Sequence, residues 1–92
     1  MTHDDARQLA LAKLRTYESP EELVLLDSQT VERPYGWVFF YNSRRFVETG
    51  NVLYALAGNG PLLVCDDGSI TVLGTAHPLD VELRTFEKTL AR

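Results

Sequence analysis

The sequence contains a single cysteine, Cys65, so the chain cannot close a disulfide within itself. It has only two histidines, and they do not lie in a group of cysteines and histidines with the spacing of a structural zinc site. We therefore expect a domain that folds in a reducing compartment without a disulfide, a metal ion or a cofactor.

Long hydrophobic runs are also missing. No stretch reaches the roughly 20 apolar residues that a membrane-spanning helix needs. The N-terminal segment Met1–Asp5 is acidic, whereas a secretory signal begins with basic residues followed by an apolar stretch. These two absences predict a cytoplasmic protein that does not act at a membrane.

Positive charge is scarce, with 9 Lys and Arg residues against 13 Asp and Glu residues and a formal net charge of −4. Affinity for nucleic acids comes mainly from basic side chains that neutralise phosphates. The charge balance therefore argues against a nucleic-acid-binding protein. A basic protein partner would fit it better.

What is present is typical of one folded domain. The 92 residues are 45% hydrophobic and 24% charged, as in ordinary soluble domains. A chain of this length has room for one hydrophobic core, so residues 1–92 are expected to form a single domain.

A helix is predicted over residues 3–18. Ala6, Leu9, Ala10, Leu14 and Tyr17 recur there at i, i+3, i+4, i+8 and i+11, which places them on one face of a helix together with Lys13 at i+7. Thr2 is a suitable N-cap, and Asp4 and Asp5 lie in the first turn, where the helix dipole favours negative charge. Pro20 stops the pattern because proline disfavours a helical conformation in the residue before it.

A second helix is predicted at the C-terminus. Pro78 suits its first position, where the missing N–H costs nothing. Asp80 and Arg84 are four residues apart, the spacing of an ion pair on one flank. The apolar seam of this helix consists of Leu79, Leu83, Phe86 and Leu90.

Strands are predicted between the two helices. Residues 23–31 are rich in β-forming residues, apolar at first and polar from Asp27 onward, and residues 33–36 form a turn. Residues 37–41 form the strongest strand because aromatic side chains suit a pleated surface. Its alternating faces are Trp37, Phe39 and Tyr41 on one side and Val38 and Phe40 on the other. Since both faces are apolar, both need cover, which makes this strand central.

The second half of the chain predicts a hairpin. Residues 42–51 are polar and are expected to be an irregular connection, followed over residues 52–57 by a short helix or an extended strip. Residues 61–66 and 69–73 are predicted strands, joined by Asp67-Gly68, which suits a type I′ turn. Together these elements indicate an α+β fold: a two-layer sandwich of an antiparallel sheet of about four strands with an N-terminal and a C-terminal helix.

The side chains that could carry chemistry have structural explanations. Cys65 ends an apolar run and is better explained as a small core residue than as a nucleophile activated by His77. Asp66 and Asp67 are adjacent, so on a strand they would point to opposite faces and not share a metal ion. Residues 58–60 lack the lysine and the following helix of a phosphate-binding loop, and a tight turn explains them better. We therefore do not expect an enzyme.

Short motifs follow one another along the chain: Trp37-Val38-Phe39-Phe40-Tyr41, Thr49-Gly50, Leu56-Ala57-Gly58-Asn59-Gly60-Pro61-Leu62-Leu63-Val64, Asp67-Gly68 and Leu73-Gly74-Thr75-Ala76. In this order they resemble the immunity protein 35 family, also described as YrhB-like domains, over about residues 5–90. The signature residues for which a structural role is expected are Trp37, Gly50, Gly58, Asn59, Gly60, Pro61, Gly74 and Thr75.

The resemblance implies an intracellular immunity protein of a bacterial polymorphic toxin system, which binds a cognate toxin and protects the producing cell. We expect an acidic surface with a few aromatic anchors to meet the toxin. The candidate contacts are Asp27, Glu32, Tyr35, Tyr41, Asp66 and Asp67. The two tyrosines are included because residues near strand ends are expected to be partly exposed.

A second hypothesis is a chaperone-like or stress-stability protein that binds exposed apolar segments. Such a protein needs a sizeable apolar patch or a free sheet edge. Residues 23–26 are the candidate for that surface.

Overall fold

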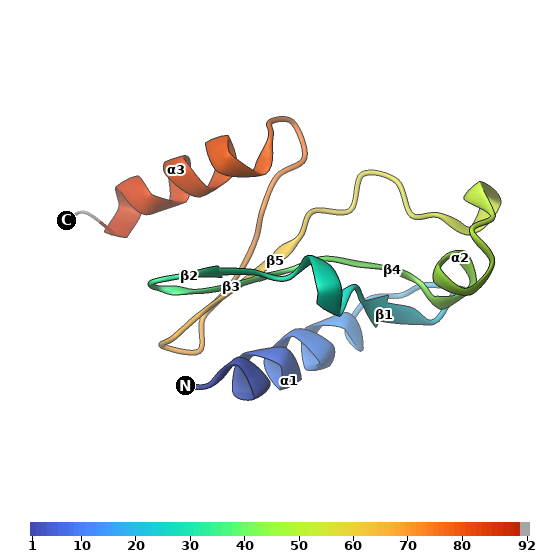
Figure 1. The fold of residues 1–92 in the computed structure, drawn as a ribbon, viewed down its shortest axis with the longest axis horizontal. Helices are drawn as coiled ribbons and strands as arrows, with labels where there is room; N and C mark the ends of the chain where they lie inside the picture. The colour runs from blue at the N-terminus through green and yellow to red at the C-terminus, as the bar shows by residue number, and fades with distance from the viewer. Residues whose placement is uncertain (91–92) are drawn as a thin grey trace.

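Two antiparallel sheets lie between a helix at each end of the chain, as the computed structural model shows; it describes residues 1–90 (Figure 1). The helices are α1 (His3–Leu14), α2 (Arg44–Thr49) and α3 (Leu79–Leu90), with two 3₁₀ turns, η1 (Asp27–Gln29) and η2 (Val52–Tyr54). The strands are β1 (Leu23–Leu25), β2 (Val31–Arg33), β3 (Gly36–Phe39), β4 (Tyr41–Ser43), β5 (Leu62–Cys65) and β6 (Ile70–Val72). The larger sheet has four strands in the order β2-β3-β5-β6, and the smaller sheet pairs β1 with β4. The predicted α+β class and the antiparallel sheet are confirmed.

The two terminal helices cover opposite faces of the four-stranded sheet (Figure 1). The face of β3 that carries Phe39 packs against α1, where Ala6 and Ala10 are fully buried. The opposite face, which carries Val38, packs against Leu83 of α3. Where two layers were expected, this part of the fold therefore has three, helix, sheet and helix. The reason is that both faces of β3 and β5 are apolar, and each must be covered.

Helix α1 begins as predicted but ends earlier. The Thr2 hydroxyl accepts a hydrogen bond from the Asp5 amide at 3.2 Å, and the Asp5 carboxylate accepts one from the Thr2 amide at 3.1 Å. The helix ends at Leu14 rather than at residue 18, since the amides of Thr16 and Tyr17 bond to carbonyls only three residues back. Tyr17 still packs against the core under α1, which explains why it matched the helical pattern.

The strands predicted over residues 23–31 and 37–41 both divide between the two sheets, which corrects that prediction. The first becomes β1 in the small sheet and, after η1, β2 in the large one. The second becomes β3 and β4, with a break at Phe40. The two breaks lie opposite each other, because the Leu26 amide donates to the Phe40 carbonyl at 2.8 Å. The aromatic run therefore passes from the large sheet into the small one.

The connection expected to be irregular over residues 42–51 is ordered, so that expectation is wrong. It contains the end of β4 and all of α2. Ser43 caps α2 by accepting a hydrogen bond from the Phe46 amide at 3.1 Å, and Gly50 ends it in the left-handed conformation with φ 71°. Of the alternatives for residues 52–57, the short helix is present as the 3₁₀ turn η2.

The predicted hairpin is present, but its turn is not type I′. Such a turn needs a positive φ at both central residues, and only Gly68 has one, at 89°. The Gly68 amide donates to the Cys65 carbonyl at 2.9 Å. The loop therefore has three residues, Asp66, Asp67 and a left-handed glycine, which is another common form of hairpin.

Helix α3 begins one residue after Pro78, whose carbonyl accepts the Glu82 amide at 3.1 Å. The predicted ion pair of Asp80 and Arg84 is present, with 3.1 Å between the carboxylate and the guanidinium. In the apolar seam Leu83 is 2% exposed, whereas Leu90 is 49% exposed. Within the described residues, none of the helices is long and apolar enough to cross a membrane.

Candidate functional site

Several of the predicted contact residues gather where two turns lie side by side at one end of the large sheet (Figure 1). The turn between β2 and β3 contacts the turn between β5 and β6 through the Asp66 amide, which donates to the Tyr35 carbonyl at 2.9 Å. We call this surface the hairpin end; its residues are Glu32, Tyr35, Asp66 and Asp67.

The carboxylates of the hairpin end are exposed. Asp67 accepts hydrogen bonds from the Ser69 hydroxyl at 2.6 Å and the Ser69 amide at 2.8 Å, and these bonds lower the pKa of Asp67. The two hydrogen bonds therefore favour the charged form of this side chain. Asp66 and Glu32 point to solvent from the turn and from the edge strand β2. The hairpin end is therefore an acidic surface on a well-ordered backbone.

Tyr35 is half-buried rather than freely exposed. Its hydroxyl donates to the Glu87 carboxylate at 2.6 Å, and its ring lies 5.6 Å from that of Phe86. Burial, and next the hydrogen bond to Glu87, raise the pKa of Tyr35 to about 12. The hydroxyl of Tyr35 is thus engaged in a hydrogen bond within the protein, which holds α3 against the sheet.

Two of the predicted contacts are placed elsewhere. Asp27 lies in η1 and accepts two hydrogen bonds from Arg7, at 2.8 and 3.0 Å, which lower the pKa of Asp27. Tyr41 is only 7% exposed, so the expectation that it is partly exposed is wrong. It belongs to β4 and faces Tyr17 and the core under α1, and burial raises its pKa. Tyr41 is the first residue of β4, but β4 continues the path of β3 into the second sheet, so Tyr41 lies within this path and over the core.

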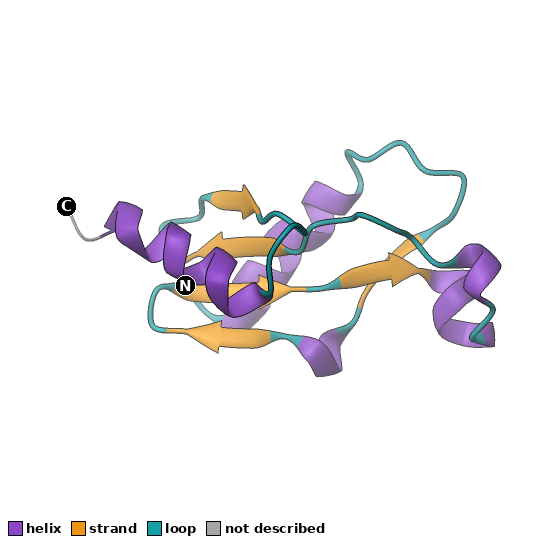
Figure 2. Cartoon of the chain, turned by 90° about the horizontal axis from the view of Figure 1, so that it is seen from above, coloured by secondary structure: helices purple, strands orange, loops and turns teal. Residues whose placement is uncertain are grey.

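Sequence reasoning missed a second surface, at the opposite end of the molecule. Figure 2 shows β4 leading into α2 and η2, which stand beyond the sheets, and Figure 1 shows them far from the hairpin end. We call residues 44–54 the lobe. Val52 and Leu53 of η2 are 76% and 84% exposed, and Val47 of α2 is 49% exposed. The signal that could have revealed this surface is an apolar pair directly after Asn51, a residue suited to cap a turn.

The lobe is held by side-chain hydrogen bonds to the backbone. The Ser43 hydroxyl is buried and donates to the Tyr54 carbonyl at 2.5 Å. The Asn42 side-chain oxygen accepts the Leu56 amide at 2.9 Å, and that of Asn51 accepts the Leu53 amide at 3.0 Å. The two exposed apolar side chains therefore stand on a fixed backbone.

The signature residues lie in β3 and in the loops that follow α2, η2 and β6. Trp37 is half-buried against the core under α1. Gly58 is left-handed with φ 74°, and a Cβ on Gly60 would collide with the Leu73 carbonyl oxygen. The Asn59 side chain donates to the Tyr41 carbonyl at 3.0 Å, which ties this loop to β4. The remaining signature residues are Gly50, which ends α2, and Pro61, Gly74 and Thr75, which line a hollow of about 210 Å³ with Asn59.

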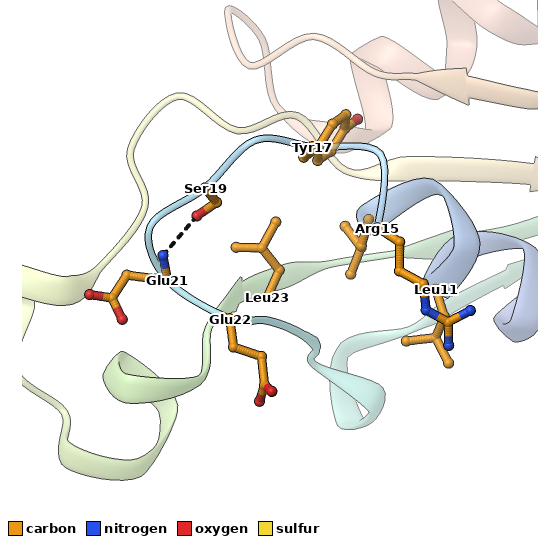
Figure 3. Close-up of a pocket in the computed structure, with 8 residues that line it drawn as sticks. Leu11, Arg15, Tyr17, Ser19, Glu21, Glu22 and Leu23 are labelled. Atoms are coloured by element: carbon orange, nitrogen blue, oxygen red, sulfur yellow. Dashed lines mark hydrogen bonds between the residues drawn. The ribbon is translucent and has the colours of Figure 1, made fainter.

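A larger hollow, of about 350 Å³, lies between the end of α1 and the segment that leads to β1 (Figure 3). Its lining consists of Leu11, Leu14, Arg15, Tyr17, Ser19, Glu21, Glu22 and Leu23. Glu21 and Glu22 are already paired with arginines of α2, at 3.5 and 2.9 Å, and Ser19 accepts the Glu21 amide at 3.2 Å. The hollow therefore offers leucine and tyrosine surface, with both glutamates and Ser19 already engaged in these contacts.

Cys65 is a core side chain, as predicted, with 5% of its surface exposed. Burial raises the pKa of the Cys65 thiol, which favours the unreactive neutral form. In residues 1–90 no group of three or more His, Cys, Asp or Glu side chains lies close enough together to hold a metal ion.

The structure thus defines a small α+β domain with exposed surfaces at its two ends. The family model described as immunity protein 35 matches residues 4–88, and the chain belongs to that family. Among curated proteins the chain is similar to "Uncharacterized protein YrhB" of Escherichia coli (strain K12), with 37% identity over 79 residues that cover 85% of this chain and 84% of the relative. No solved structure gives a significant match. The resemblance found in the sequence motifs is confirmed.

Proposed function

We propose that this protein is an immunity protein that binds a toxin domain and neutralises it without itself catalysing a reaction. The observation that carries the proposal is the match to the immunity protein family over nearly the whole chain, residues 4–88. The protein would act in the cytoplasm of the bacterium that makes the toxin, as part of a polymorphic toxin system.

The hairpin end supports one part of this proposal. An immunity protein must reach its toxin quickly, and opposite charges on the two partners speed their encounter. Glu32, Asp66 and Asp67 supply negative charge on one ordered surface of a chain with a net charge of −4. The proposed toxin is accordingly basic, and these carboxylates speed its approach.

The surface expected for a chaperone-like protein, residues 23–26, is partly buried. Residues 23–25 form β1, which pairs with β4, and Leu25 is buried. Leu23 packs partly buried against the core under α1. Leu23, Val24 and Leu26 keep part of their apolar surface exposed, but none of them is among the largely exposed apolar side chains, so the immunity function, which the family match supports, is the one we put forward.

Co-expression tests the function. The protein is produced together with the toxin domain encoded by the neighbouring upstream gene, and growth rescue and one-to-one co-purification are scored. Rescue with co-purification is expected. Failure to rescue or to bind any linked toxin candidate would refute the proposed function.

A charge-reversal pair then tests the hairpin end. Glu32→Lys with Asp66→Lys should slow association with the toxin domain about tenfold at low salt, and the difference should shrink at high salt. Glu18→Lys, compared with Asp66→Lys alone, is the matched control, because each changes the net charge equally at an exposed residue and Glu18 lies away from the hairpin end. Equal slowing by both variants would show that only the total charge matters.

A further inference from the structure

We infer that the lobe is the part of this protein that enters the toxin, with Val52 and Leu53 as an apolar knob that fills a concave, apolar-lined cleft of the toxin domain. This inference rests on the proposed function and names the contact surface for it.

The knob is exposed and fixed at the same time. Val52 and Leu53 are 76% and 84% exposed, the two highest values among the large apolar side chains of the described residues. Their backbone is held by Asn51 on one side and by the bond from Ser43 to the Tyr54 carbonyl on the other. A preorganised apolar group loses little conformational freedom on binding, so this is the arrangement expected of a binding anchor.

The charges around the knob are paired with one another. Arg44 lies 2.9 Å from Glu22 and 3.2 Å from Glu48. Arg45 lies 3.5 Å from Glu21, and its guanidinium stands 4.8 Å from the centre of the Tyr54 ring. Because each arginine is already matched by a carboxylate, the lobe has no free cations for an anionic lipid surface. Its partner must instead offer an apolar pocket with a polar rim, which is the usual anatomy of a protein interface.

The shape and size of the lobe indicate which kind of partner can bind it. The lobe forms one end of a molecule 43 Å long (Figures 1 and 2). A protruding end fits a concave site, and ligand and active sites of enzymes are concave and mostly apolar. A second copy of this chain is a poorer occupant, because a stable interface covers about 800 Å² on each partner and three exposed apolar side chains supply far less. When the lobe sits in a cleft of the toxin domain, the walls of the cleft also contact the residues around Val52 and Leu53, which enlarges the contact area.

The test uses the toxin domain encoded by the neighbouring upstream gene as the probe. Leu53→Asp is expected to weaken its binding at least about 30-fold and to abolish growth rescue. Val72→Asp is the matched control, because Val72 is 51% exposed on the edge strand β6, outside the lobe. Both variants should keep the wild-type thermal unfolding temperature within a few degrees, since both side chains are largely in solvent.

The outcomes distinguish failure of this inference from failure of the proposed immunity function. Binding by Leu53→Asp within threefold of wild type, while wild type rescues growth, would overturn the lobe as contact surface and leave the immunity function standing. If wild type neither binds nor rescues, the immunity function fails and the inference fails with it. Sedimentation of the free protein as a dimer that Leu53→Asp converts to a monomer, with toxin binding unchanged, would assign the knob to a second copy and overturn the inference.

Discussion

The hydroxyl of Tyr35 donates a 2.6 Å hydrogen bond to Oε2 of Glu87 and so joins the turn between β2 and β3 to the last helix. The neighbouring rings of Tyr35 and Phe86, 5.6 Å apart, add apolar contact at the same place. Tyr35 belongs to the hairpin end, so this hydrogen bond links α3 directly to that surface.

Tyr35→Phe should destabilise the protein by about 1–2 kcal/mol, because it removes a half-buried hydrogen bond to a carboxylate while keeping the ring. A loss of this size lowers the melting temperature by roughly 4–8 °C for each kcal/mol in a domain of this length. Urea denaturation measures it. Glu87→Gln keeps an acceptor and should cost less; an equal loss in both variants would point to the charge of Glu87 rather than to the hydrogen bond.

Stability should fall in the alkaline range because of the same tyrosine. Burial and Glu87 raise the pKa of Tyr35 from 10.0 to about 12, so the folded state prefers the neutral phenol. Its contribution is complete below pH 10 and is lost as the pH rises toward 12. Denaturation midpoints at pH 9, 10 and 11 should decline less steeply in Tyr35→Phe than in wild type. Parallel declines would exclude Tyr35 as the source.

Two glycines of one loop should respond differently to alanine. A Cβ on Gly60 would collide with the Leu73 carbonyl oxygen, so Gly60→Ala should cost about 3 kcal/mol or more through displacement of backbone. Gly58 has φ 74° and open space around it, so Gly58→Ala should cost only the left-handed strain, about 1 kcal/mol. Thermal unfolding of the two variants makes the comparison, and equal costs would refute this account of the loop.

The pair of Arg7 and Asp27 should contribute little to stability in spite of its good geometry. Both side chains are substantially exposed, at 32% and 52%, and surface ion pairs are worth less than about 1 kcal/mol. Since Arg7 lowers the pKa of Asp27, the contribution is present above the ordinary aspartate pKa and lost as the pH falls through the lowered one. A double-mutant cycle with Arg7→Gln and Asp27→Asn, run at pH 7 and at a series of lower pH values, measures it. A coupling energy that does not decline as the pH falls below the ordinary aspartate pKa would contradict the assignment.

The sequence predicts those elements whose signal is local. The cap at Thr2, the ion pair of Asp80 and Arg84 and the hairpin around Gly68 each depend on residues a few positions apart, and each is present. Helix α2 has an equally local signal in Ser43 and Gly50, but its residues are polar and short of apolar periodicity, so pattern alone does not reveal it.

The division of the aromatic strand has a different cause. Nothing in residues 37–41 distinguishes one strand from two, because the break at Phe40 is set by which partner strand lies alongside. Phe39 pairs with Leu62 in the large sheet, whereas Tyr41 pairs with Leu25 in the small one. The same pairing with a strand distant in sequence buries Tyr41, so Tyr41 is not part of the candidate surface. Site prediction failed there because exposure depends on tertiary pairing.

The hydrogen bonds that shape the lobe arise from Asn42, Ser43 and Asn51, and the side chains of residues 47–53 belong to neither core cluster. New side chains at the outward positions of this segment would leave the sheets and both terminal helices as they are. Relatives that share the scaffold can therefore diverge in partner choice by exchanging one short stretch of sequence. For an engineer, the same stretch is a place to graft a new specificity onto an unchanged framework.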